Sequence, residues 1–247
     1  MKNSTTVQTK GIVLKNSRIR DNSADIAVIT PGMGIIEFSK FGYNSKKNDF
    51  RPLLQPINLL DLKFDRQKNR LSITDVSLIC NYTSLKSDYG KIQAVMSIFK
   101  SILSSNTFDD KDYDLIYLLI KRMCSSFEEN DMCLVTASVY FYFQLAWCMG
   151  ISFSFKDDPD NGHNYLQTEN GLFFKKGTLL EKDTAYRLSD HLYEQMKKFQ
   201  DLKFAQIHKL DYITLKEFNE FREMFRRYTG YHLNRPFYIS ALEISEE

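Results

Sequence analysis

The feature that most constrains the fold of this sequence is a change in the spacing of its apolar residues near residue 84. Before that point, apolar and polar residues alternate in short runs, a pattern typical of half-buried β-strands. After it, apolar residues recur at steps of three and four, a pattern typical of amphipathic α-helices. The sequence therefore predicts an α+β protein in which a small β-domain is followed by an all-helical domain.

Turn signals divide the first part of the chain into five short strands. The second and third meet at Pro31-Gly32-Met33-Gly34, a dense turn signal. The fourth and fifth are joined by the polar and basic residues 65–70, a typical hairpin connection. Five strands with short loops fit a partly open barrel of the OB type, with an SH3-like barrel as the main alternative. The expected strands are residues 7–14, 25–30, 34–43, 55–64 and 71–80.

Helical periodicity governs most of the second part of the chain. Residues 132–149 are apolar nearly all round, which indicates the central helix of a bundle. A last helix is expected to begin at Thr214, because Thr214-Leu215-Lys216-Glu217 forms a capping box. Periodicity is lost over residues 152–182, where we expect a loop-rich insertion. The other expected helices are 91–103, 112–127 and 184–199, and the expected domains are 1–82, an OB-fold, and 83–247, a helical domain.

The charges of the two parts differ in sign. The chain as a whole has 33 Lys and Arg against 31 Asp and Glu, a net charge of +2. Residues 1–82 hold 13 of the basic and 7 of the acidic residues, a net charge of +6, so the remainder carries −4. A basic part joined to a mildly acidic one predicts a surface for polyanions on the β-domain alone.

No combination of residues in the sequence indicates catalysis. There is no Gly-rich phosphate loop, no nucleophile elbow and no paired-His metal motif, so we expect a protein that is not an enzyme. The cysteines have neither zinc-finger spacing nor the density of a disulfide framework, and buried thiols are the simpler interpretation. They are Cys80, Cys124, Cys133 and Cys148.

Nothing in the sequence suggests export or a membrane span. The first residues contain no apolar core typical of a signal peptide. The most apolar stretch, residues 139–151, is too short to cross a bilayer. We therefore expect a soluble, cytoplasmic protein without membrane contacts.

One acidic run, residues 157–162, resembles a calcium loop at first sight. With Asp157 in the first position, the third would be Pro159 and the twelfth Thr168, where an EF-hand needs an oxygen ligand and a bidentate Glu. A solvated turn is the simpler interpretation. The alternative is a metal-dependent nuclease that uses Asp157, Asp158 and Asp160.

The basic residues of the β-domain are the most informative set. Aromatic residues fall among them, and cations that hold phosphates beside rings that stack on bases bind single strands without sequence preference. The alternative is that these charges are solvated loop residues and that the aromatics fill the barrel. An RNA-binding OB module also fits the composition. The expected nucleic-acid contacts are Lys15, Arg18, Arg20, Lys40, Lys46, Lys47, Arg51, Arg66, Lys68 and Arg70; the aromatics are Phe38, Phe41, Tyr43, Phe50 and Phe64.

Several segments resemble the RecO family of recombination proteins. Lys10-Gly11-Ile12-Val13-Leu14-Lys15 opens the chain as in that family, and Thr30-Pro31-Gly32-Met33-Gly34 is similar to its "T-P-x-x-G" step. Residues 40–47 are similar to the segment that leads into its basic loop, although Phe41 stands where members usually have Gly. Many members carry a four-Cys zinc module, whereas residues 150–185 here contain no Cys. The chain resembles the branch without metal, and we expect no zinc and no cofactor. The remaining similar segments are 53–56 and 228–233.

The resemblance implies a bacterial, nucleoid-associated recombination mediator. Such proteins bind single- and double-stranded DNA and anneal complementary strands that are coated by single-stranded DNA-binding protein. They also assist loading of RecA, an indirect partner, together with RecR. The acidic, Phe-ended tail of the single-stranded DNA-binding protein docks on the helical domain. Candidate cations for that tail, none of them assigned, are Lys121, Arg122, Arg226 and Arg227.

Overall fold

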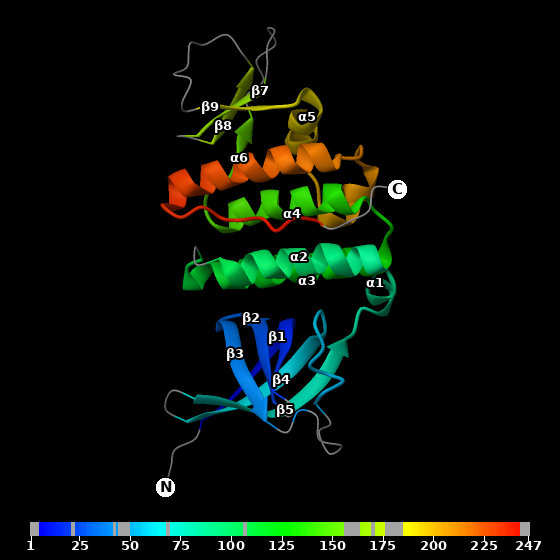
Figure 1. The fold of residues 1–247 in the computed structure, drawn as a ribbon, viewed down its shortest axis with the longest axis vertical. Helices are drawn as coiled ribbons and strands as arrows, with labels where there is room; N and C mark the ends of the chain where they lie inside the picture. Colours follow the sequence, from blue (N-terminus) through cyan, green and yellow to red (C-terminus); the bar gives the residue numbers. More distant parts are fainter. Residues whose placement is uncertain are drawn as a thin grey trace. The chain divides into compact units, whose positions relative to one another are not determined.

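The computed structural model describes the chain in two compact units, shown in Figure 1. The barrel unit comprises Met1–Ser87 and Asp109–Ser125, and the helical unit comprises Asp88–Phe108 and Ser126–Glu247. The structure describes all residues except 1–4, 21–22, 42, 44–49, 68–69, 106–107, 156–163, 169–170, 176–184 and 243–247.

The barrel unit contains a five-stranded antiparallel sheet with the strand order β3-β2-β1-β4-β5. The central strand β1 pairs with β4 through its first half and with β2 through its second half. Register shifts between Val13 and Lys15 and between Arg18 and Arg20 bend β1 along the way. This arrangement is OB-like and confirms the five predicted strands. The strands are β1 (Thr5–Arg20), β2 (Ser23–Thr30), β3 (Gly34–Phe41), β4 (Leu59–Gln67) and β5 (Arg70–Cys80).

Alternating residues of the strands build the core of this sheet. Ala24, Ile26 and Val28 of β2 are buried on one face, as are Leu62 and Phe64 of β4. Side chains of both neighbouring strands fill the space beside Gly11: a Cβ atom built there would be 2.5 Å from Val28 and 2.9 Å from Leu62. The absence of a side chain at this position therefore allows the packing of its neighbours.

The fourth strand begins later than predicted, at Leu59 instead of residue 55. Turns occupy residues 50–57, where the amide of Leu54 donates to the carbonyl oxygen of Phe50. Ile57 has a φ of 75°, which interrupts the extended backbone. The apolar pattern of residues 53–57 reflects burial of this turn and not strand pairing.

Helix α3 (Tyr113–Glu129) begins on the turn between β2 and β3. The Gly32 amide donates to Oδ1 of Asp114 at 2.5 Å, a carboxylate in the first helical turn, where the helix dipole favours it. Gly34 has a φ of +67°, and its position leaves 3.0 Å between a built Cβ and the Tyr113 ring. The unit also holds the short helix α1 (Thr83–Ser87) and a 3-10 turn, η1 (Asp110–Asp112).

The helical unit is arranged around α4 (Leu134–Cys148), which lies beside α6 in Figure 1. Most of α4 is buried, as predicted from its apolar sequence. Tyr142 is fully buried, with its hydroxyl 2.9 Å from Oγ of Ser101, and burial raises its pKa. The other helices are α2 (Tyr89–Ser104), α5 (Asp190–Phe199), η2 (Phe204–Lys209) and α6 (Leu215–Leu233).

The predicted capping box at the start of α6 is confirmed. Oγ1 of Thr214 accepts from the Glu217 amide at 3.2 Å, and Oε2 of Glu217 accepts from the Thr214 amide at 2.8 Å. Two amides that have no partner within the helix are thereby satisfied.

One part of the expectation for the second domain is corrected: it is not all helical, and the insertion at 152–182 is not only loops. The described residues there include a four-stranded sheet of order β6-β8-β7-β9. Its strands have two to four residues, too few for alternation to stand out. The expected helix 184–199 likewise starts as a strand, with Ser189 as the N-cap of α5. The strands are β6 (Ser154–Phe155), β7 (Asn164–Gln167), β8 (Leu172–Lys175) and β9 (Ala185–Leu188).

Two further observations concern the expectations about cysteines and membranes. All four cysteines are free thiols, with Cys124 and Cys148 buried and the other two half-buried. Within the described ranges, no helix combines the length and the apolar character that a membrane span requires.

The close packing at Gly11 leads to a stability prediction. Gly11→Ala should lower the free energy of unfolding by about 1–3 kcal/mol, because the added methyl group overpacks Val28 and Leu62. The control is Gly230→Ala in α6, where the nearest atom lies 3.6 Å from a built Cβ. Helix propensity makes that substitution neutral or stabilising by up to about 1 kcal/mol. Urea unfolding followed by circular dichroism compares them; equal stabilities of the two variants would contradict the packing argument.

Candidate nucleic-acid interface

A hydrogen-bond network joins the two ends of the expected basic loop. The loop residues 44–49 lie outside the described part of the chain, but Tyr43 and Arg51 on either side of them are described. The buried Tyr43 hydroxyl donates to the carbonyl oxygen of Arg51 at 3.3 Å, and Nε2 of Gln55 donates to the same oxygen at 2.7 Å. Nδ2 of Asn16 donates to the Tyr43 hydroxyl and to the carbonyl oxygen of Leu54. These contacts fix both ends of the loop against β1.

Two of the expected cations meet beside this network. The Lys40 ammonium lies 4.6 Å from the centroid of the Phe50 ring, a cation–π contact. Arg51, the next residue after Phe50, is exposed. The end of β3 and the turn after the loop therefore present positive charge at one place.

The strand register adds two more cations to the same end of the sheet. Arg18 and Lys40 both pair with Ala24 of β2, so the three residues form one row across β1, β2 and β3. Arg20 and Phe41 both pair with Ser23 in the adjacent row. The side chains of Arg18 and Arg20 are not described, but their strand positions are. We call Arg18, Arg20, Lys40 and Arg51 the β3-end cluster.

Lys15 lies in a different environment from the β3-end cluster. It lines a hollow of about 300 Å³ together with Asp25, Glu37 and Ser39. Oδ1 of Asp25 accepts from the Ser39 hydroxyl at 2.6 Å. Two carboxylates offset the Lys15 ammonium there, so this hollow is a weaker attractor of phosphate than the β3 end.

The remaining expected cations form a second group at the β4–β5 hairpin. Arg66 is exposed and pairs with Thr5, at the opposite end of β1 from Arg20. Arg70 begins β5 and pairs with Gln67. The ten expected contacts are therefore not one surface, since the register separates the hairpin from the β3-end cluster. Lys46, Lys47 and Lys68 lie outside the described residues.

The structure sorts the aromatic residues between core and surface. Phe38 packs edge to face on the buried Phe64, with ring centroids 5.7 Å apart. Tyr43 is buried, and Phe50 is half-buried below Lys40. Phe41 differs, because 81% of it is exposed. The barrel-filling interpretation therefore holds for Phe38, Tyr43 and Phe64 but not for Phe41, which the alternation along β3 places on the opposite face from Phe38.

The carboxylates of the nuclease alternative, Asp157, Asp158 and Asp160, lie outside the described residues. In the part of the chain that is described, no three His, Cys, Asp or Glu side chains are grouped closely enough to hold a metal ion.

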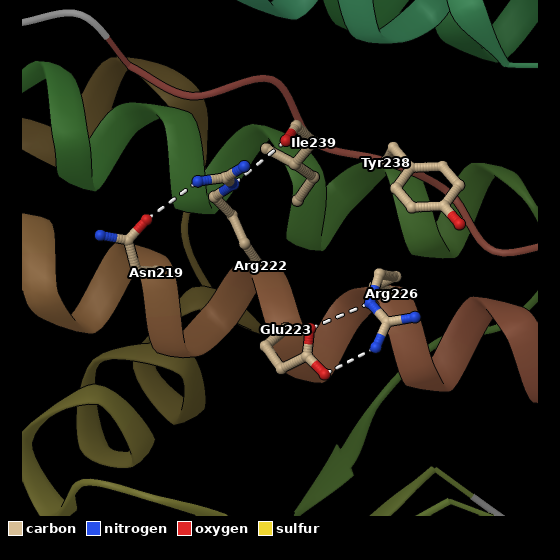
Figure 2. A pocket seen from close by; sticks show the side chains of 6 residues that line it. All are labelled: Asn219, Arg222, Glu223, Arg226, Tyr238 and Ile239. Carbon is tan, nitrogen blue, oxygen red and sulfur yellow. Dashed lines mark hydrogen bonds and ion pairs between the residues drawn. The ribbon is translucent and has the colours of Figure 1, made fainter.

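A second pocket, on α6 of the helical unit, was missed by the sequence analysis. Figure 2 shows Arg222, Glu223 and Arg226 of α6 facing Tyr238 and Ile239 of the chain after it. The pocket has a volume of about 210 Å³, and 62% of Tyr238 is exposed. The sequence alone does not predict this pocket, because its residues come together only where the segment after α6 folds back along that helix.

Hydrogen bonds hold the guanidinium groups of this pocket in place. Nε of Arg222 donates to the carbonyl oxygen of Ile239 at 3.1 Å, and Nη1 donates to Oδ1 of Asn219 at 2.9 Å. Arg226 donates twice to Glu223, at 2.7 and 2.9 Å. Hydrogen bonds from Arg226 and then Arg227 lower the pKa of Glu223 to about 2. Of the four tail candidates, Arg226 and Arg227 belong to the helical unit, and Lys121 and Arg122 belong to the barrel unit.

Comparison with known proteins identifies the barrel unit's sheet. Residues 1–82 match the family model described as "Recombination protein O N terminal", a range that includes all five strands. The comparison with curated proteins gives no match. Residues 1–82 of the chain are therefore similar to a RecO N-terminal domain, and they fold into an OB-like sheet.

Proposed function

We propose that this protein is a non-enzymatic mediator of recombinational DNA repair. It binds single- and double-stranded DNA, anneals complementary strands coated by single-stranded DNA-binding protein, and assists RecA loading together with RecR. The observation that carries the proposal is the RecO N-terminal match over residues 1–82, in a sheet whose β3 end gathers four basic residues. It acts on nucleoid DNA in the bacterial cytoplasm.

The β3-end cluster suits a surface that handles two DNA strands. Annealing brings two polyanions together, which requires cations that lower their mutual repulsion and release counterions. The described cations lie on strands and on a turn, in contrast to the helices that read bases in the major groove. Binding without sequence preference is what an annealing activity needs.

Removal of two described charges tests this DNA surface. At low salt, the double variant Lys40→Gln and Arg51→Gln should bind a labelled single-stranded oligonucleotide roughly 10-fold more weakly for each phosphate that it no longer neutralises. The slope of log affinity against log salt should become less negative by about 0.7 for each of these phosphates. Fluorescence anisotropy over a salt series measures both quantities.

A matched variant controls for net charge. Lys209→Gln with Lys216→Gln removes the same charge from two exposed residues of the helical unit. It should leave affinity and slope as in the parent protein. Equal weakening by both double variants would mean that net charge alone governs binding, and would contradict the assignment of the β3 end.

The α6 pocket supports a place for the acidic tail of the single-stranded DNA-binding protein. Arg222 and Arg226 supply guanidinium groups, which pair well with carboxylates. The exposed Tyr238 supplies apolar surface for a terminal aromatic ring. Two nitrogens of the Arg226 guanidinium, Nε and Nη2, already donate hydrogen bonds to Glu223. We therefore assign Arg222 as the cation that binds the tail's terminal carboxylate.

Substitution of Arg222 tests this second surface. Arg222→Ala should weaken binding of an acidic peptide that ends in Phe by roughly 10- to 100-fold, because the variant cannot form the charge-assisted hydrogen bond. Lys209→Ala, also in the helical unit, is the control and should change nothing. Isothermal titration calorimetry gives both affinities; an unaltered affinity in Arg222→Ala would place the tail elsewhere.

A further inference from the structure

We propose that Phe41 stacks on an unpaired base and makes the β3 end prefer single-stranded DNA to duplex. The inference rests on the proposed DNA-binding function and adds a specificity-determining residue to it. It identifies the ligand at this position as an exposed nucleobase, whereas the cations around it recognise only phosphates.

The first observation is the exposure of the Phe41 ring. At 81%, it is the most exposed large hydrophobic side chain in the described part of the chain. A single exposed apolar residue is common on protein surfaces and needs no explanation by itself. Its position at the end of β3 is what suggests a ligand.

The second observation is the row in which Phe41 lies. Phe41 and Arg20 both pair with Ser23, and the next row holds Lys40 and Arg18 on either side of Ala24. Directly paired residues of neighbouring strands lie about 5 Å apart, so the Phe41 and Arg20 positions, with Ser23 between them, are about 10 Å apart in one row. Lys40, one residue before Phe41, follows the alternation to the opposite face at the same end of β3. A single strand held by a phosphate at Arg20 would bring a base within reach of Phe41.

The third observation is that nearby aromatics are already engaged. Phe38 packs on Phe64 in the core, and the Phe50 ring lies below the Lys40 ammonium. Tyr43 is buried and hydrogen-bonded to Arg51. Among the five aromatics named for the barrel unit, Phe41 alone combines large exposure with a strand position in the row of Arg20.

Stacking at this position discriminates between kinds of DNA. An unpaired base offers its face to a ring, whereas the bases of a duplex are stacked on one another and offer only their edges. Phosphate contacts are available from both forms. Removal of the ring should therefore weaken single-strand binding selectively.

The test compares Phe41→Leu with the parent protein on a single-stranded oligonucleotide and on a duplex of the same length. The variant should bind the single strand roughly 5- to 100-fold more weakly, the worth of one base stacked on an aromatic ring. Duplex affinity and both salt slopes should stay unchanged, because no charge is removed. Urea unfolding should also be unchanged, since the side chain is exposed.

A second variant reports base stacking through tryptophan fluorescence. The chain has a single tryptophan, Trp147, so Phe41→Trp combined with Trp147→Phe moves the only indole to the β3 end. The variant should bind single-stranded DNA with parental affinity, and that DNA should quench the indole fluorescence, whereas duplex should quench it far less. Absence of quenching at saturating single strand would overturn the proposal.

The outcomes separate this proposal from the function on which it rests. If the parent protein binds DNA, and Phe41→Leu binds single strand and duplex with the same affinities as the parent protein, stacking is wrong and the proposed function stands. Equal weakening on single strand and duplex would also overturn stacking. If the parent protein binds neither form, the proposed function itself fails. Weaker self-association of Phe41→Leu, seen by sedimentation, with unchanged DNA affinity would assign the ring to a protein interface instead.

Discussion

The pairing of β1 with two partners is the constraint on which the barrel unit depends. This bent strand of 16 residues pairs with β4 through its first half and with β2 through its second half. The bulges at Val13 and Arg18 permit the bend, and Gly11 permits close packing beside it. Because β1 fixes the register of its neighbours, it also decides which basic residues share a row. The chemistry of the surface follows from the pairing of the sheet.

In the proposed DNA surface, hydrogen bonds fix the backbone on both sides of residues 44–49. Tyr43, Gln55 and Asn16 join the backbone on both sides of residues 44–49, so Arg51 and Lys40 are presented from anchored positions. The hairpin cations, among them Arg66, lie at the other end of β1. Under the proposed function, these two separated basic groups would each hold one of the two strands that are annealed.

The sequence predicted those elements whose signals are local. Alternation and the Pro31–Gly34 turn signal predicted the strands, and the Thr214 capping box predicted where α6 begins. The small sheet β6–β9 was not predicted, because its strands are too short to show the two-residue alternation of a β-strand. Alternation placed Phe41 on the outer face of β3, but it could not predict an exposure of 81%. The division of the cations into two groups depends on strand register, and the α6 pocket depends on the return of the C-terminal segment, so neither follows from local patterns.

The most direct test of the proposed mediator function is the annealing rate of complementary oligonucleotides coated with the cognate single-stranded DNA-binding protein. Strand pairing is followed by fluorescence without nucleotide or metal ion. The protein should accelerate annealing and the double variant of Lys40 and Arg51 should not, although it remains folded. Undiminished acceleration by that variant would contradict the assigned DNA surface, and no acceleration by the folded parent protein would contradict the proposed function.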